Sequence, residues 1–280
     1  MSNWRKYNGF LLPKKPPHLK QSCSKLSIFI EVLKKSAYFA RWYEGFDASE
    51  DGNFYFVIKD TFLSLENLPS KNRREITRGL ELCYVQQIES KEYIELMYQV
   101  YKNAINGYLK FHEGLSYSDY CSYIHSQSDL GEVDLFGVFD RASKNLIGYS
   151  INIIQDVQVE YSNVKLDPTY IKNYSSYALF YKMNEHYLSD NSFTYVNDGA
   201  KSILHESDIQ EYLIRKHGFR KSFCELKVIY HPMTWVIVKL LYPFRSYFQR
   251  ANNYTMKKIL SLLIQEEILR LSADRKSKPL

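Results

Sequence analysis

The sequence has few cysteines, and no two of them are close together. Cys23, Cys83, Cys121 and Cys224 form no Cys-x-x-Cys pair among the 280 residues. This absence excludes the usual spacing of a structural zinc site and of a dithiol redox centre. Cys83 and Cys224 lie in apolar runs of strand-forming residues, which predicts two buried thiols. The pattern fits a reducing cytoplasm.

Long apolar segments are also absent. The longest run, near Trp235–Tyr242, is interrupted by Lys239. It is far shorter than the roughly 20 residues that a membrane-spanning helix needs. Residues 1–6 lack the apolar core of a signal peptide. We therefore expect a cytoplasmic protein without a transmembrane segment, in which any membrane contact is peripheral and at the inner membrane surface.

The signatures of several enzyme classes are missing as well. The sequence has no metal-binding spacing, no Walker loop and no Gly-x-Ser-x-Gly element. These absences argue against a kinase or a serine hydrolase, and they predict that no metal ion is bound. No internal repeat or low-complexity segment is visible.

The composition that is present is typical of a globular protein with one or two domains, since 45% of the residues are hydrophobic and 24% are charged. The 25 tyrosines are a high number. Because tyrosine is amphipathic, they indicate either hydrated clefts and interfaces or a compositional bias.

The net charge is +6, and Glu31 is the only acid in residues 1–41. Such a basic surface suits membrane lipid, tRNA or an anionic glycan, or it is a solvated face.

Local patterns predict the elements of the first half of the chain. Residues 1–20 are expected to form an irregular basic arm, and residues 28–33 a short buried element whose type stays open. The predicted strands are Phe54–Ile58 and Cys83–Ile88. The predicted helices run from Pro69 to near Gly79, from Ser90 onward, and over Ser118–Ser126.

The second half alternates between strands and helices. A hairpin is predicted from Val133–Phe139 and Leu146–Ile154, and the sheet continues with Val157–Leu166. Then follow a helix at Ser175–Leu188, a strand at Phe193–Val196, a helix at Ser207–His217 and a strand at Lys221–Tyr230. An apolar stripe over 256–271 predicts a final helix. The tail formed by Trp235–Phe248 and this helix is either a cover on the core, which we favour, or a membrane-surface or dimer element.

The stretch Val164–Phe219 carries a family resemblance. Its order of strand, turn, helix, strand and helix ends in Lys216-His217-Gly218-Phe219. This order resembles the acyl-CoA-binding half of the GNAT acyltransferases. The resemblance implies an α/β (α+β) fold with a mixed, mostly antiparallel sheet flanked by helices. It also implies three regions, namely an N-terminal basic arm with an accessory strand region (1–70), a GNAT-like core (71–232) and a C-terminal helical extension (233–280).

The resemblance assigns a donor site to the turn before the Ser175–Leu188 helix. In the family, a glycine-rich loop of the form Arg/Gln-x-x-Gly-x-Gly/Ala presents helix N–H groups to the cofactor pyrophosphate. Here the loop is Lys172-Asn173-Tyr174-Ser175-Ser176-Tyr177-Ala178, in which serines replace the glycines and are expected to cap the helix. The implied donor-binding residues are Val164, Leu166, Lys172, Asn173, Ser175, Ser176 and Tyr177.

The missing glycines make this loop resemble the divergent Fem-type and related cell-surface acyltransferases. The expected co-substrate is acyl-CoA, with aminoacyl-tRNA or an acyl carrier protein as alternatives because some Fem-type enzymes use them. A splayed gap is expected beside Val164–Leu166, with the N-terminus of the helix from Ser175 facing it.

The acceptor side is predicted in the polar loop after the Phe193–Val196 strand, at the edge where α/β sheets usually hold ligands. His205 is the candidate general base because its ordinary pKa suits proton transfer near neutrality, and Glu206 is the second candidate. Asp198 is expected to orient the amine, while Asn197 and Ser202 bind substrate. Arg73 and Arg74 are candidate anion contacts. The alternatives are an ordinary Asp198-Gly199 turn, a surface His205 and a solvated start of the helix at Arg73 and Arg74.

One position departs from the family. Many GNAT enzymes have an acidic tyrosine four residues before the glycine of the Gly-Phe pair, but Ile214 stands there and Tyr212 lies two positions away. We expect an acyltransferase, N-acetyl, acyl or aminoacyl, that acts on an amine or hydroxyl of a sugar or cell-envelope precursor, as in polysaccharide biosynthesis. The alternatives are a non-catalytic GNAT-fold binding protein and a basic membrane- or RNA-associated protein.

Overall fold

The computed structural model describes residues 3–48, 54–108, 114–203, 208–249 and 253–277. The chain forms two compact units. The central unit comprises Ile58–Gly199 and Glu211–Arg220, and the terminal unit comprises Met1–Val57, Ala200–Gln210 and Lys221–Leu280. Each unit is therefore assembled from segments that are separated in the sequence.

The sheet of the central unit is mostly antiparallel. Its strands lie in the order β9-β8-β7-β6-β5. Antiparallel pairing joins β5 (Cys83–Gln87) to β6 (Glu132–Asp140), β6 to β7 (Leu146–Gln155), and β7 to β8 (Gln158–Leu166). The parallel pair is β8 with β9 (Tyr195–Ala200). The predicted hairpin and the predicted mixed sheet are therefore confirmed.

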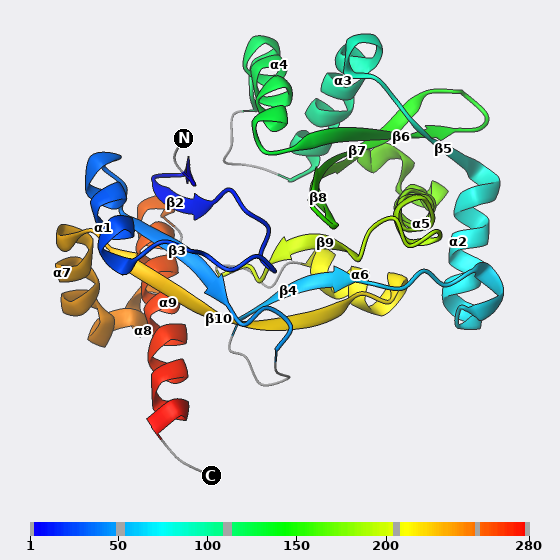
Figure 1. The fold of residues 1–280 in the computed structure, drawn as a ribbon. Coiled ribbons are helices and arrows are strands. Elements are labelled where there is room, and N and C mark those ends of the chain that lie inside the picture. The colour runs from blue at the N-terminus through cyan, green and yellow to red at the C-terminus, as the bar shows by residue number, and fades with distance from the viewer. Residues whose placement is uncertain (1–2, 49–53, 109–113, 204–207, 250–252, 278–280) are drawn as a thin grey trace. The chain divides into compact units, whose positions relative to one another are not determined.

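Helices cover both faces of this sheet (Figure 1). Because side chains alternate along a strand, β6 and β7 feed two different cores. Leu135, Tyr149 and Ile151 pack with α3 (Ser90–Tyr108) and α4 (Tyr117–Ser126). On the other face, Tyr161 packs against Phe180 of α5 (Ser175–Leu188).

Helix α2 (Ser70–Leu82) lies against α5. It extends three residues beyond Gly79, where we predicted its end. Gly79 is buried, and a Cβ atom added to it would lie 2.7 Å from the Tyr174 carbonyl oxygen and 3.1 Å from the Ala178 nitrogen. The absence of a side chain at this position therefore lets the two helix backbones approach closely. Helix α6 (Asp208–His217) ends at Gly218, whose φ of +70° favours glycine.

The strands of the terminal unit lie in the order β1-β2-β3-β10-β4. The strands are β1 (Trp4–Tyr7), β2 (Phe10–Pro13), β3 (Phe39–Glu44), β10 (Arg220–Tyr230) and β4 (Phe54–Lys59). Helix α1 (Lys25–Lys34) packs Ile28 and Val32 against Ala40 and its neighbour Ile229. Helix α9 (Tyr254–Ser277) lies on the opposite face, where Gln265 donates a hydrogen bond to the Tyr230 hydroxyl.

The prediction of an irregular basic arm over residues 1–20 is wrong for residues 4–13, whereas residues 14–20 form neither helix nor strand. Strands β1 and β2 form a hairpin there, joined by Asn8 and Gly9 with φ values of +47° and +86°. An Asn-Gly pair with two positive φ angles is the preferred two-residue hairpin turn. The arm is ordered because Trp4 and Leu11 are buried in the core with α1. Strand β3 was also missed.

The predicted final helix is confirmed as a cover. Helix α9 starts at Tyr254, and it buries Leu263 and Ile268 together with Gln265. Three shorter segments connect it to the last strand, namely α7 (Pro232–Leu241), η4 (Tyr242–Phe244) and α8 (Arg245–Phe248). Among the described residues, no helix combines the length and the apolarity needed to cross a membrane.

Candidate functional site

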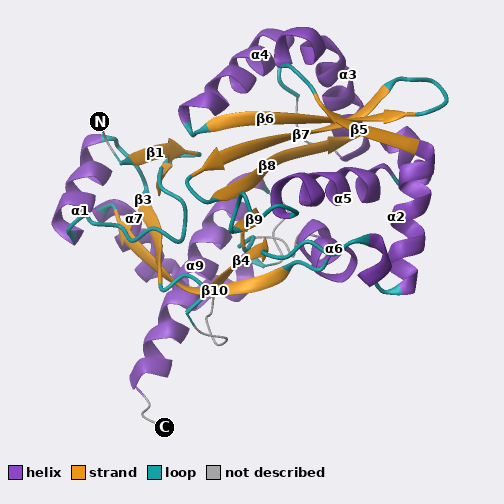
Figure 2. Cartoon of the chain, turned by 45° about the vertical axis from the view of Figure 1, so that its right-hand side comes forward, coloured by secondary structure: helices purple, strands orange, loops and turns teal. Residues whose placement is uncertain are grey.

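The central sheet opens between β8 and β9 (Figure 2). Strand β8 pairs with β7 along its whole length, from Gln158 to Leu166. Its pairing with β9, as described, joins residues 158–160 to residues 195–197. In the register described, residues 161–166 of β8 are not paired with β9. This register confirms the divergence predicted beside Val164–Leu166.

A hydrogen-bonded turn leads the chain from β8 to α5. Asp167 is buried, and its Oδ1 accepts hydrogen bonds from the Thr169 nitrogen and hydroxyl while Oδ2 accepts one of 2.6 Å from Asn103. Burial alone would raise the pKa of Asp167, but the bonds from Thr169 and Asn103 hold that pKa below its ordinary value. Pro168–Asn173 then form the short helix η3. The start of α5 is therefore fixed by the end of β8.

Helix α5 begins differently from the prediction. The residue before it, Tyr174, adopts the left-handed conformation with φ +54° and makes no side-chain capping hydrogen bond. The prediction that Ser175 and Ser176 cap this helix is wrong, because both lie inside its first turn. Ser175 is buried. Since α2 packs on Tyr174 through Gly79, this first turn is supported from outside α5.

A chain of three polar side chains lies at this turn. The Ser176 hydroxyl is 2.9 Å from the Tyr212 hydroxyl, which is 3.2 Å from Nε2 of His217. Aromatic rings surround the three groups, since Tyr177 and Phe180 both contact the rings of Tyr212 and His217. Helix α6 thereby places a phenolic hydroxyl on the first turn of α5.

Burial determines the protonation of these groups. It raises the pKa of Tyr212 above its ordinary value, so the hydroxyl keeps its proton at neutral pH. Burial also lowers the pKa of His217 to about 3, with smaller contributions from the charges of Lys59 and Lys216. His217 is therefore neutral, and it offers one donor and one acceptor nitrogen to its surroundings.

We expect His217 to make folding pH-dependent. Its pKa is about 3 in the fold against roughly 6.5 in an unfolded chain. Stability is therefore fully present above the unfolded pKa and is lost as the pH falls toward the folded one. The loss is about 1.4 kcal/mol per pH unit below roughly pH 6.5.

Urea unfolding between about pH 4.5 and 7.5 measures this slope. His217→Gln should flatten the slope, whereas the control His125→Gln, at an exposed position of α4, should leave it unchanged. Equal slopes for wild type and His217→Gln would show that another group is responsible.

The predicted donor residues cluster around the same turn. Val164 and Leu166 are half-buried on β8, and Lys172 is exposed on η3. Asn173 donates a 2.7 Å hydrogen bond to Asp140, and its carbonyl accepts one from Cys83. Tyr177 is half-buried, with the Lys216 ammonium 5.7 Å from its ring centroid. The structure brings Ser176 and Tyr177 together with Tyr212, which we had not assigned.

The predicted acceptor residues are less concentrated. Asn197 is buried and donates to Gln158, while its side-chain oxygen accepts from the Gly199 nitrogen, as in an ordinary Asx turn. Asp198 lies near enough to Tyr161 to raise the pKa of that phenol, after the larger effects of burial and of Tyr187. Ser202 belongs to the terminal unit. His205 and Glu206 lie outside the described residues.

Arg73 and Arg74 are exposed on the first turns of α2. The Arg73 guanidinium is 3.5 Å from the Glu66 carbonyl oxygen, and nearby Lys216 forms an ion pair of 2.6 Å with Glu75 of the same helix. This surface of α2 is therefore rich in charge.

Tyr212 and His217 were not assigned to the site from the sequence. No pattern within α6 could show their position, because their partners come from α5.

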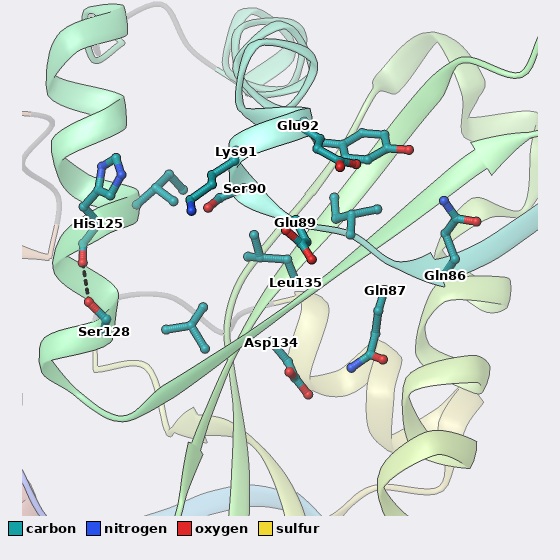
Figure 3. A pocket seen from close by; sticks show the side chains of 14 residues that line it. Gln86, Gln87, Glu89, Ser90, Lys91, Glu92, His125, Ser128, Asp134 and Leu135 are labelled. Carbon is teal, nitrogen blue, oxygen red and sulfur yellow. Dashed lines mark hydrogen bonds between the residues drawn. The ribbon is translucent and has the colours of Figure 1, made fainter.

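A pocket of about 640 Å³ lies elsewhere in the central unit (Figure 3). Residues of β5, the start of α3, the end of α4 and β6 form its walls, among them Gln86, Ser90, Lys91, His125, Ser128 and Leu135. None of the predicted site residues lines it.

Among the described residues, no group of three or more His, Cys, Asp or Glu side chains could hold a metal ion.

Comparison with known proteins defines the fold. No family model and no curated protein matches the sequence. Among solved structures, FemX matches with a TM-score of 0.53 at 11% identity, covering 85% of each chain. L-PGS from Bacillus licheniformis matches with a TM-score of 0.51 at 12% identity, covering 94% of this chain and 85% of that chain.

A third match is the C-terminal domain of a protein from Agrobacterium fabrum that is described as a lysylphosphatidylglycerol synthetase. Its TM-score is 0.52 at 12% identity, and the match covers 84% of this chain and 82% of that chain. The protein therefore shares the fold of these structures, and the predicted GNAT-like fold and the resemblance to Fem-type proteins are confirmed at the level of the fold.

Proposed function

We propose that the protein is an acyltransferase that moves an acyl or aminoacyl group onto an amine or hydroxyl. One observation carries this proposal, namely the divergence of β9 from β8 just before the turn that leads into α5. Main-chain N–H groups on the edge of β8 at 161–166 are suited to polarise a carbonyl that enters there. The N-terminus of α5 supplies a partial positive charge for an anionic donor.

The reaction needs a base and an acid. The acceptor nitrogen or oxygen attacks the carbonyl carbon, a new bond forms, and the bond from that carbon to the leaving sulfur or oxygen breaks. The acceptor loses one proton and the leaving group gains one. We propose His205 as the base, with Glu206 as the alternative, and Asp198 as the residue that orients the acceptor. We propose Tyr212 as the proton donor, because its hydroxyl lies 2.9 Å from Ser176 on the first turn of α5.

The candidate donors are acyl-CoA, an acyl carrier protein and aminoacyl-tRNA, of which we favour the aminoacyl ester of a tRNA. The loop before α5 lacks glycine, and Tyr174 presents a large, partly exposed side chain there. Such a loop offers less room to a pyrophosphate than a glycine-rich one. The exposed cations Lys172, Arg73 and Arg74 suit the phosphates of an RNA. The name of the Agrobacterium fabrum match, which is described as a lysylphosphatidylglycerol synthetase, supports an acceptor in the cell envelope.

A thermal-shift panel with acetyl-CoA, an acyl carrier protein and a set of aminoacyl-tRNAs tests the proposal. Binding to the folded state raises the melting temperature, and the rise grows with the logarithm of the ligand concentration once that concentration exceeds the Kd. One donor class should stabilise the wild type, and Lys172→Ala should weaken that effect while Lys102→Ala, on α3, should not. If no donor class stabilises the protein, the acyltransferase proposal fails.

A non-catalytic binding protein is the second candidate. Ile214 occupies the usual position of the acid, and the Tyr212 hydroxyl already has two partners within the fold. Tight binding of an envelope precursor, without turnover for any donor in the panel, supports this candidate.

A further inference from the structure

Helix α7 presents apolar side chains outward. Within its ten residues, Thr234 and Val238 are buried, whereas Met233, Trp235, Val236, Ile237 and Leu240 are exposed. The exposed fractions of Met233 and Leu240 are 71% and 66%, and Phe244 of η4 follows at 63%. We call these six exposed residues the α7 surface.

This pattern differs from that of an ordinary surface helix, because apolar residues lie on the outward face as well as at the buried Val238. A helix on a soluble protein turns its apolar stripe inward and its polar residues outward. In α7 the hydroxyl-bearing Thr234 faces inward, and most of the outward positions are apolar. Contiguous exposed apolar residues of this kind mark a surface that binds protein or lipid.

The chain segment that contains α7 is rich in cations, of which Lys227 is paired with Glu225 at 2.8 Å. Between Glu225 and Glu266 the sequence has no acidic residue, and its six cations are Lys227, Lys239, Arg245, Arg250, Lys257 and Lys258. Arg245 is paired with Glu267 at 3.0 Å. Lys239 is exposed within α7, and its ammonium is 5.7 Å from the Trp235 ring centroid. Tryptophan beside lysine is typical of the lipid headgroup region.

We propose that the α7 surface docks the protein onto an anionic lipid membrane, with α7 in the plane of the headgroups. A ten-residue helix is about 15 Å long, half the thickness of the hydrocarbon core, so α7 lies in the interface without spanning the bilayer. This inference goes beyond the proposed acyl transfer and does not depend on it.

The exposure of α7 favours lipid over a protein partner. A partner protein covers one face of a helix, whereas lipid fills the space around several faces, and here residues 235, 236, 237 and 240 point in different directions. A second copy of this chain would bring the exposed Lys239 of both copies to one interface, and like-charge repulsion would disfavour that contact.

Co-sedimentation of the full chain with vesicles tests this proposal. Vesicles of phosphatidylcholine are compared with vesicles that also contain phosphatidylglycerol. The wild type should bind the anionic vesicles and be released by high salt, because salt screens the attraction of surface cations to anionic lipid. The double variant Trp235→Ser/Leu240→Ser should bind more weakly, by about tenfold for each lost apolar contact.

Leu96→Ser is the matched control, since Leu96 is exposed on α3 of the central unit. It should bind the vesicles like the wild type, and equal melting temperatures should show that all variants are folded. The proposal is overturned if the wild type ignores anionic vesicles or if the double variant binds them equally well. It is also overturned if sedimentation equilibrium shows a dimer that the double variant dissociates, because the occupant is then a second copy.

Discussion

Tyr212→Phe is expected to lower the rate of acyl transfer by about 10²–10⁴-fold, the usual contribution of a positioned acid. The Tyr212 hydroxyl lies on the first turn of α5, 2.9 Å from Ser176, and burial keeps it protonated. Phenylalanine keeps the ring contacts with Tyr177 and Phe180 but removes the proton. The measurement is kcat with saturating donor, together with the KM for the donor.

Ser176→Ala is the control for this prediction. It removes the other partner of the Tyr212 hydroxyl but leaves the proton and its bond to His217. If the hydroxyl acts as an acid, Ser176→Ala should keep kcat within roughly threefold of the wild-type value. Equal losses in both variants would mean that the hydrogen bonds only hold the turn in place.

His205→Ala is expected to cost about 10²–10⁴ in turnover while donor binding stays nearly unchanged, because a base acts on the acceptor rather than on the donor. His205 lies outside the described residues, so this prediction rests on its position between β9 and α6. His205→Gln should behave like His205→Ala if the proton transfer matters. It should be milder if the side chain only donates a hydrogen bond.

The pH dependence separates a basic from a structural role of His205. Wild-type turnover should rise with pH through the range near 6.5 where an unperturbed histidine loses its proton. Near wild-type turnover of both variants at every pH would contradict the assignment of His205 as the base. Glu206→Gln then tests the second candidate in the same assay.

The sequence predicted most of the central unit because its signals are local. The bounds of α5, Ser175–Leu188, were predicted as observed, and the hairpin of β6 and β7 was placed within one or two residues. Apolar periodicity and turn residues lie within a few positions of the elements that they define. The Asn8-Gly9 turn was an equally local signal, but the surrounding lysines and prolines led us to expect an irregular arm.

The candidate site was predicted only in part because its contacts are not local. Ser176 and Tyr212 are 36 residues apart in the sequence. Tyr212 was set aside because it does not align with the position of the family acid. Its direction follows from how α6 packs on α5, and no spacing within α6 reveals that packing. Similarly, Gly79 contacts Tyr174 only because α2 and α5 meet.

The buried cysteines illustrate the same limit. Burial of Cys83 and Cys224 was predicted from their apolar neighbours, and both are buried with their thiol pKa values raised to about 11 and about 12. The hydrogen bond from Cys83 to the Asn173 carbonyl was not predictable. This hydrogen bond joins β5 to the turn before α5. Cys83, which was expected only to fill the hydrophobic core, therefore also supports the candidate site.

Amide hydrogen exchange with and without donor tests the central claim most directly. The donor used is the one from the thermal-shift panel that stabilises the protein, whether acetyl-CoA, the acyl carrier protein or an aminoacyl-tRNA. If the opening between β8 and β9 holds the donor, protection should appear at residues 161–166 and at the start of α5, residues 174–178. Protection confined to the pocket residues of Figure 3, near 86–93 and 124–135, would contradict the account and place the ligand on the other face of the sheet.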